Sequence, residues 1–169
     1  YNPWMFRLSI LNYPIETNFL KAMWAINQDN IPEVGSVPTL EEFQKLTLWS
    51  SHVIIVEENE EMAGFIILMR EDQDYHSLNY KYLINKFDQF LYVDRVAIKD
   101  GFRRQGLGKK IYDEVFRLAK EIDIDVCCEV NTEPRNGPSL AFHDTFGFKD
   151  VGTKQFDDHS VVYLKSSVK

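Results

Sequence analysis

The chain has 169 residues, 44% of them hydrophobic, which is enough to fill the core of one compact domain. Its formal net charge of −7 and pI near 5.1 argue against nucleic-acid binding, which needs a basic face. No apolar run reaches the roughly 20 residues of a membrane span, so we expect residues 1–169 to form a single domain that binds neither nucleic acid nor membrane.

The first third of the chain predicts a strand, then two helices joined by a loop. The segment FRLSIL predicts a strand over residues 6–11. Apolar residues at helical spacing predict a helix over residues 17–28, with Thr17 as its N-cap. Residues 30–38 contain two prolines and a glycine and should form a loop. Thr39 and Glu42 then have the spacing of a capping box, which predicts a second helix from Thr39.

The middle of the chain changes to the period of strands. Residues 52–58 and 62–70 are separated by a short acidic turn and predict an antiparallel hairpin. Residues 71–88 are polar and rich in tyrosine, and we expect a long loop. Residues 89–98 are apolar on both alternating faces except at Asp94 and Arg95, which is typical of a central strand covered on both sides.

The last part of the chain returns to alternating helices and strands. A strong apolar stripe predicts a helix over residues 106–122. A strand over 125–130, a short helix over 138–146 and two closing strands over 148–156 and 159–166 should follow. Strands and helices alternate while hairpins occur at both ends, so the predicted fold class is α/β, of the α+β type, with a mixed sheet.

The number and position of the cysteines indicate the cellular compartment. The only two cysteines, Cys127 and Cys128, are neighbours that would point to opposite faces of a strand, and they cannot build a disulfide framework. The first residues show no signal-peptide pattern. Together these features predict a cytoplasmic protein.

A basic cluster surrounds Gly106 and Gly108, where the strand ending near Ile98 leads into a helix. The first amides of a helix have no partner within the helix, and the helix dipole makes this end attractive to phosphate. Glycine lets an anion approach the backbone. The side chains that would add charge-assisted hydrogen bonds are Arg103, Arg104 and Lys109. The glycine spacing fits neither the dinucleotide fingerprint nor the P-loop, so the residues alone predict a site for a small anion.

The segment RRQGLG, residues 103–108, matches the R/Q-x-x-G-x-G/A signature of the GCN5-related N-acetyltransferases, the GNAT superfamily. VDRVAI before it resembles the fourth strand of that fold, and NGPSLAFHDTFGF resembles the family's closing segment. The resemblance covers residues 92–148. Within the superfamily, the combination of motifs resembles an uncharacterised bacterial-type branch. It implies a mixed, mostly antiparallel sheet of about six to seven strands with about four helices on both faces. It also implies acetyl-CoA as co-substrate and no metal.

The resemblance assigns the cofactor-binding residues one by one. Val96, Ala97 and Ile98 would pair with the pantetheine arm as if it were an added strand. The pyrophosphate would be held around the signature, by Arg103, Arg104, Gln105, Gly106, Leu107, Gly108 and Lys109. Asn136 matches the family's asparagine that contacts the coenzyme arm; it could equally be a turn or N-cap residue beside Gly137 and Pro138.

The resemblance also suggests catalytic residues. His143 stands where many relatives have a tyrosine that protonates the CoA thiolate, and an imidazole with a pKa of about 6.5 can serve a thiolate of parent pKa about 8.5. Alternatively, His143 packs under the last strands. Asp94 is the expected general base, because a carboxylate on a strand covered on both faces needs a reason to be there. It could instead pair with a cation, and Glu129 is the second choice of base.

The implied function is transfer of an acetyl group from acetyl-CoA to a primary amine, by direct attack and a tetrahedral intermediate. A backbone N–H near Val96 or Ala97 would stabilise the oxyanion. The acceptor would be a small-molecule or peptide amine, bound by the first two helices, the loop 30–38 and the long segment 71–88, whose acidic residues suit a cation. No metal site is suggested by the spacing of the other histidines, His52, His76 and His159.

Two other functions stay open from the sequence. A non-catalytic module of the same fold could bind or sense acyl-CoA, and the absence of the family's tyrosine favours it. A plain anion-binding α/β domain would show no preference for CoA over phosphate. Exposed strand edges at the C-terminus would allow a homodimer.

Overall fold

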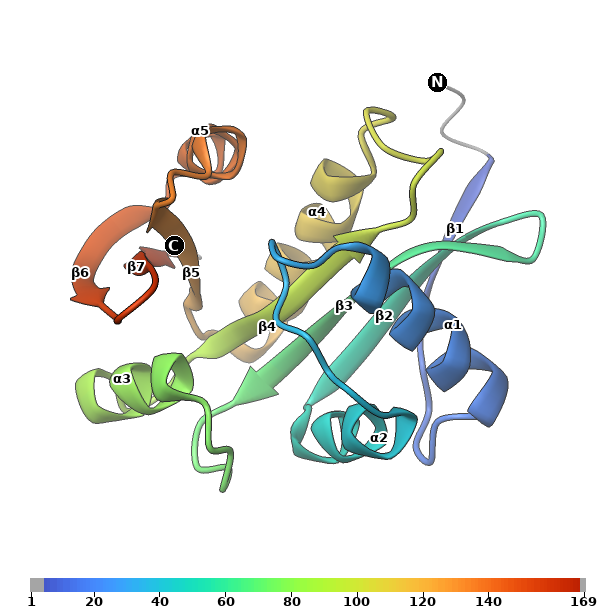
Figure 1. Ribbon diagram of the computed structural model, residues 1–169, viewed down its shortest axis with the longest axis horizontal. Coiled ribbons are helices and arrows are strands. Elements are labelled where there is room, and N and C mark those ends of the chain that lie inside the picture. Colours follow the sequence, from blue (N-terminus) through green and yellow to red (C-terminus); the bar gives the residue numbers. More distant parts are fainter. Residues whose placement is uncertain (1–4, 168–169) are drawn as a thin grey trace. The chain divides into compact units, whose positions relative to one another are not determined.

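The computed structural model describes residues 5–167, which contain seven strands and five helices (Figure 1). The strands form one mixed sheet in the order β1-β2-β3-β4-β5-β7-β6, which confirms the predicted fold class. The chain divides into two compact units: Tyr1–Met69 with Val93–Glu114, and Arg70–Tyr92 with Val115–Lys169. The single domain over residues 1–169 stays a prediction.

The first unit contains the predicted hairpin. Strand β1 (Phe6–Ile10) pairs antiparallel with β2 (His52–Glu58), which pairs antiparallel with β3 (Glu61–Arg70). The turn between β2 and β3 consists of Asn59 at φ 50° and Glu60 at φ 67°. Two left-handed residues give a tight turn the twist that the flanking strands require, and asparagine adopts this conformation readily.

Helix α1 spans Thr17–Asp29 and α2 spans Leu40–Trp49. The predicted capping box of α2 is confirmed, because the Glu42 amide donates to Thr39 Oγ1 at 3.1 Å and the Thr39 amide donates to Glu42 Oε2 at 3.2 Å. The predicted cap at Thr17 is wrong. Thr17 is already helical, and the N-cap is Glu16, whose side chain makes no capping hydrogen bond.

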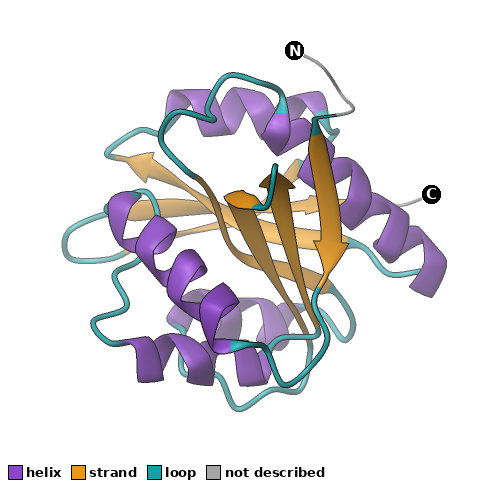
Figure 2. Cartoon of the chain, turned by 90° about the vertical axis from the view of Figure 1, so that its right-hand side faces the viewer, coloured by secondary structure: helices purple, strands orange, loops and turns teal. Residues whose placement is uncertain are grey.

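The core of the first unit is made where α1 and α2 cover the strands (Figures 1 and 2). Met23 on α1 and Phe43 on α2 are fully buried, and the ring of Phe43 meets that of Phe65 on β3 edge to face. Residues 53–56 of β2 are buried without alternation, which means that both faces of this strand are covered.

Strand β4 (Leu91–Ile98) and helix α4 (Leu107–Ile122) each begin in one unit and end in the other. The stripe predicted for α4 is buried along its length, at Leu107, Ile111, Val115 and Leu118, whereas Ile122 at its end is exposed. The loop from Lys99 to Gly106, which carries Arg103 and Arg104 of the basic cluster, thus runs from the end of β4 to the start of α4.

The second unit contains α3 (Leu78–Lys86), β5 (Val126–Glu133), α5 (Gly137–Thr145), β6 (Lys149–Gln155) and β7 (Ser160–Ser166). Strand β5 pairs in parallel with the start of β4, through Leu91 with Val126 and Tyr92 with Cys127. Strand β7 pairs antiparallel with both β5 and β6.

Helix α3 corrects the prediction of a loop over residues 71–88. Ser77 is its N-cap and accepts from the Tyr80 amide at 3.3 Å. Tyr80 and Leu83 are fully buried, and the Tyr80 hydroxyl donates to the carbonyl of Arg70 at 2.8 Å. In the sequence, apolar and aromatic residues stand at every second position from Leu78 to Tyr82, so the pattern does not show the helical period.

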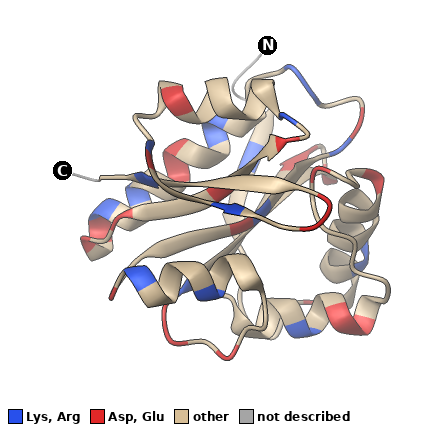
Figure 3. Ribbon diagram, turned by 60° about the vertical axis from the view of Figure 1, so that its left-hand side comes forward, with Lys and Arg blue, Asp and Glu red and all other residues tan. Residues whose placement is uncertain are grey.

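Acidic and basic residues are spread over helices, strands and loops (Figure 3), so the basic cluster is a local feature of an acidic chain. In the part of the chain that the structure describes, no helix has the length and hydrophobicity to cross a lipid bilayer.

Candidate functional site

The loop between β4 and α4 is shaped by residues in the left-handed region. Gly101 has φ 92°, Arg104 φ 62° and Gly106 φ 76°. A Cβ added at Gly101 or Gly106 would meet no atom within 4 Å, so glycine is needed here for its backbone conformation. Arg104 adopts this conformation despite its side chain, and such residues occur often where a loop clamps a ligand.

The turn at Gly106 leads directly into the first turn of α4. The first amide that donates within the helix is that of Lys110, to the carbonyl of Gly106 at 3.1 Å. The amides of Leu107, Gly108 and Lys109 precede it and have no acceptor within the helix. The side chain of Leu107 is buried, so this residue can offer a ligand its backbone but not its side chain. The first turn of α4 contains no acidic residue.

Cationic residues lie next to these amides in the chain. Arg103 and Arg104 are exposed, and Arg103 Nη2 donates to Asn30 Oδ1 at 2.7 Å. Lys109 is exposed and forms an ion pair with Asp113 at 2.9 Å, one turn along the helix. Gln105 donates to the carbonyl of Gly101 at 3.2 Å and so stabilises the loop itself. The sequence predicted this arrangement, and its donors fit a diphosphate.

The end of β4 carries the backbone that was predicted to pair with the pantetheine arm. Ala97 is buried, whereas Val96 and Ile98 are half-buried. The carbonyl of Ile98 accepts from Asn30 Nδ2 at 3.3 Å. An added Cβ at Gly64 on β3 would lie 2.8 Å from the Ala97 carbonyl oxygen, so β3 and β4 approach closely here because Gly64 has no side chain.

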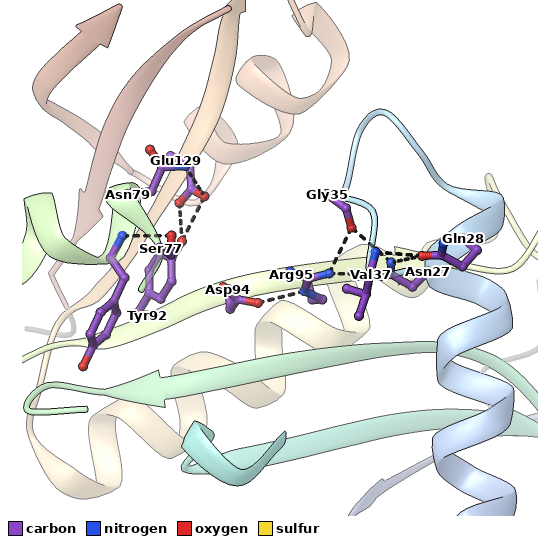
Figure 4. A network of polar contacts seen from close by, with 11 residues as sticks. Asn27, Gln28, Gly35, Val37, Ser77, Asn79, Tyr92, Asp94, Arg95 and Glu129 are labelled. Carbon is purple, nitrogen blue, oxygen red and sulfur yellow. Dashed lines mark hydrogen bonds and ion pairs between the residues drawn. The ribbon is translucent and has the colours of Figure 1, made fainter. Parts of the chain in front are cut away.

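Asp94, the predicted base, is paired. Its Oδ2 accepts from Arg95 Nε at 2.8 Å, and the two side chains are only 3% and 10% exposed. Arg95 Nη1 also donates to Asn27 Oδ1 at 2.9 Å and to the carbonyl of Gly35 at 3.1 Å (Figure 4). The structure therefore confirms the alternative interpretation of Asp94, as the partner of a cation. Its role as base stays a prediction.

Asn136, in the second unit, is the N-cap of α5. Its Oδ1 accepts from the Ser139 amide at 3.2 Å, and its own amide donates to the carbonyl of Asn131 at 3.0 Å. The local alternative for this residue is thus confirmed, and contact with the coenzyme remains a prediction.

His143 is 5% exposed on α5, and its ring meets those of Phe142 and Phe148 edge to face. Its Nδ1 lies 2.7 Å from the carbonyl oxygen of Ser139, a geometry in which Nδ1–H donates. Burial lowers the pKa of His143, and the hydrogen bond to Ser139 opposes this shift. A neutral ring with its proton on Nδ1 suits packing, so the role as proton donor stays a prediction.

Glu129 on β5 anchors a polar cluster in the second unit (Figure 4). The Tyr92 hydroxyl lies 2.9 and 2.8 Å from its two carboxylate oxygens, and Asn79 Nδ2 donates to Oε1 at 3.1 Å. Asn79 Oδ1 in turn accepts from the Tyr163 hydroxyl at 2.8 Å. Burial and then the nearby charge of Glu129 raise the pKa of Tyr163.

The partners of Glu129 were not predicted. The sequence predicts a loop at Asn79, and it predicts that Tyr92 and Tyr163 are ordinary strand residues. The available signal was Glu129 itself, a carboxylate between apolar strand residues.

The cysteines are both buried. Burial raises the pKa of Cys127 to about 12 and that of Cys128 well above its usual range, so neither thiol can act as a nucleophile at neutral pH. Among the described side chains, no three from His, Cys, Asp and Glu come together as a metal site.

Comparisons with known proteins find similarity in sequence and in fold. A model of the acetyltransferase (GNAT) family matches residues 20–148, a segment that contains the loop after β4 and Glu129. No curated protein matches the sequence.

Solved structures share the fold at low sequence identity. The ribosomal-protein-S18-alanine N-acetyltransferase of Escherichia coli has a TM-score of 0.71 at 17% identity, over 98% of this chain and 95% of that chain. A GNAT acetyltransferase of Elizabethkingia anophelis with acetyl-CoA bound has a TM-score of 0.66 at 11% identity, over 96% and 98%. Arabidopsis thaliana Naa50, in complex with a bisubstrate analogue that contains CoA, has a TM-score of 0.70 at 14% identity, over 95% and 98%.

Proposed function

Because the chain belongs to the acetyltransferase (GNAT) family, we propose that it transfers the acetyl group of acetyl-CoA to a primary amine. One observation carries the proposal. The left-handed turn at Arg104 and Gly106 delivers the first amides of α4 beside exposed cations, with no acidic residue in that turn. These are the donors that a pyrophosphate requires.

The residues proposed to hold acetyl-CoA lie in the loop after β4 and at the end of that strand. The amides of Leu107, Gly108 and Lys109 would bind the pyrophosphate, with Arg103 and Arg104 adding charge. The backbone of residues 96–98 would pair with the pantetheine arm. Two structures of the same fold contain acetyl-CoA or a CoA-based analogue, which supports this assignment.

When bound, acetyl-CoA supplies a thioester whose carbonyl carbon the amine attacks through a tetrahedral intermediate: a C–N bond forms, the C–S bond breaks, and sulfur leaves as a thiolate. The amine must first lose a proton, because only its lone pair attacks. A backbone N–H near Val96 or Ala97 would stabilise the oxyanion.

Two carboxylates are candidates for the base, one in each unit. Asp94 accepts from the guanidinium of Arg95 at 2.8 Å, so its charge is balanced locally. Glu129 accepts from the Tyr92 hydroxyl and from the side-chain amide of Asn79. Asp94, the first choice from the sequence, and Glu129, the second choice, both stay proposed candidates for the base.

The acceptor is proposed to be a small-molecule or peptide amine. Solved structures of the same fold include an acetyltransferase for a ribosomal-protein alanine and a putative phosphinothricin N-acetyltransferase. In this chain, the exposed acidic side chains of Asp72 and Asp74 precede α3 and would attract a positive charge. A cytoplasmic location and a homodimer remain predictions.

The second candidate function is an acyl-CoA-binding module without turnover. One observation favours it: the expected proton donor, His143, is buried with a lowered pKa, and its Nδ1–H is donated to Ser139. A neutral ring of this kind donates a proton poorly to a leaving thiolate.

Release of free thiol from acetyl-CoA distinguishes the two functions. We expect thiol release that depends on an added amine, in a panel containing a diamine, phosphinothricin and a short peptide with a free N-terminus. The chain's own cysteines are buried with raised pKa values, so they should give no background while the protein stays folded. Saturable binding of acetyl-CoA without thiol release for any amine would favour the binding module.

A further inference from the structure

Side chains of α1 hold Val37, in the loop between α1 and α2, on both sides of its peptide. The Val37 amide donates to Gln28 Oε1 at 3.0 Å, and its carbonyl accepts from Trp24 Nε1 at 2.7 Å. The Val37 side chain is itself buried. A loop residue with both backbone groups bonded and its side chain packed has little freedom to move.

The carbonyl of Gly35, two residues earlier, receives two further hydrogen bonds. Asn27 Nδ2 on α1 and Arg95 Nη1 on β4 both donate to it at 3.1 Å. Asn27 is fully buried, and its Oδ1 accepts from Arg95 Nη1 at 2.9 Å. Arg95 thus joins strand, helix and loop within the first unit. We call the four side chains that hold residues 35–37 the latch: Trp24, Asn27, Gln28 and Arg95.

The latch contains a buried charge. Arg95 is 10% exposed and its counter-ion Asp94 is 3% exposed. An ion pair taken out of water gains little net stability over apolar side chains of the same volume, but it does fix one geometry. The planar guanidinium suits that purpose, because Nε donates to Asp94 while Nη1 reaches Asn27 and Gly35.

The latch lies next to the residues of the proposed reaction. Arg95 immediately precedes residues 96–98, which are proposed to pair with the coenzyme arm, and residues 30–38 were predicted to line the acceptor side. At the end of α1, Asn30 donates to the Ile98 carbonyl at 3.3 Å and accepts from Arg103 at 2.7 Å. The same helix end therefore contacts the loop of the proposed pyrophosphate site.

We propose that Arg95, held by Asp94, is a positioning residue that fixes residues 35–37 against β4 as one wall of the acceptor site. The proposal rests on the acetyltransferase function above and gives Asp94 the role of counter-ion. A preformed wall spares the acceptor the cost of ordering the loop, so its loss raises the acceptor KM.

Hydrogen exchange at the Val37 amide tests the latch without any substrate. Arg95→Lys keeps a positive charge for Asp94 but loses the fork that reaches Asn27 and Gly35. A guanidinium has no acceptor, so Arg95 cannot bond the Val37 amide directly, and faster exchange there shows that the latch acts as a unit. We expect exchange about tenfold faster, the equivalent of one lost hydrogen bond. Exchange equal to wild type would overturn the proposal.

Two further variants keep this test interpretable. Lys21→Ala, at an exposed position of α1, is the matched control and should leave Val37 exchange unchanged. If Arg95→Lys does not fold, the half-buried Gln28 offers a second variant: Gln28→Ala should speed exchange at Trp24 Nε1–H, whose acceptor is the Val37 carbonyl. Unchanged exchange of that indole proton would likewise contradict the latch.

Kinetics separate positioning from mere stability. With the amine of the panel that is turned over fastest, Arg95→Lys should raise the acceptor KM about tenfold while kcat and the KM for acetyl-CoA change less than about twofold. Asp94→Asn should behave in the same way. A fall in kcat with unchanged acceptor KM and unchanged Val37 exchange would instead make Asp94 the base. If no amine is acetylated, the proposed function fails, and Val37 exchange alone decides the latch.

Discussion

His143 shows how a residue's surroundings constrain its chemistry. The sequence places it at the position of a proton donor, whereas its ring is packed between Phe142 and Phe148 and bonded to Ser139. Both interpretations were open from the sequence, because helical spacing cannot show how deeply a single side chain is buried. Substituting a packing residue changes mainly the free energy of unfolding, whereas substituting a proton donor changes kcat.

The pH dependence of unfolding reports the buried state of His143. Its folded pKa lies below the ordinary value of 6.5, so the unfolded chain binds the proton more readily. The resulting stabilisation is complete above pH 6.5 and is lost as the pH falls from 6.5 through the folded pKa. In urea titrations, the free energy of unfolding of wild type should therefore fall over this interval more steeply than that of His143→Phe.

The exposed Leu48 offers the control for this experiment, because it has no titratable side chain: Leu48→Ala should keep the pH dependence of wild type. Identical slopes for His143→Phe and wild type would contradict the account of His143. His143→Phe also bears on catalysis. If His143 is the proton donor, its loss should lower kcat with little change in acetyl-CoA affinity. A packing residue would change stability alone.

At the scale of elements, the two helices of the first unit begin in different ways. Helix α2 has a complete capping box at Thr39 and Glu42, whereas Thr17 makes no cap for α1. Thr39→Ala should lower the free energy of unfolding by about 1 kcal/mol, and Thr17→Ala should change it by less than about 0.5 kcal/mol. Chemical denaturation of both variants measures the difference. Equal losses would contradict the assignment of the caps.

The packing of β3 on β4 depends on Gly64. An added Cβ would lie 2.8 Å from the Ala97 carbonyl oxygen, which is backbone and cannot rotate away. Gly64→Ala should therefore destabilise the fold by about 1–3 kcal/mol. Gly35→Ala, where a Cβ meets nothing within 4 Å, should cost less than about 0.5 kcal/mol. Comparable denaturation midpoints for the two variants would show that the strands adjust without cost.

At the scale of the whole molecule, the sequence predicted the features that depend on local pattern. The hairpin of β2 and β3, the amphipathic α4 and the glycine loop before it all have a period or a turn residue that specifies them. Helix α3 was missed because its first apolar and aromatic residues, Leu78, Tyr80 and Tyr82, stand at every second position, a spacing that does not show the helical period.

The polar networks could not be predicted from the sequence. Arg95 and Asn27 are 68 positions apart, and Tyr92 and Glu129 are 37 positions apart, so no local spacing connects them. The sequence did show that Asp94, Arg95 and Glu129 are charged residues on otherwise apolar strands. It could not show which partners would compensate their burial, because those partners depend on the tertiary fold.

Calorimetric titration of acetyl-CoA tests the central claim, that the loop after β4 binds this molecule through its pyrophosphate. We predict saturable heat with wild type and with Lys120→Ala, an exposed lysine at the far end of α4. Arg103→Ala combined with Arg104→Ala should weaken binding at least about tenfold, because charge-assisted hydrogen bonds are lost. No heat with folded wild type, or equal affinity in the double variant, would contradict the claim.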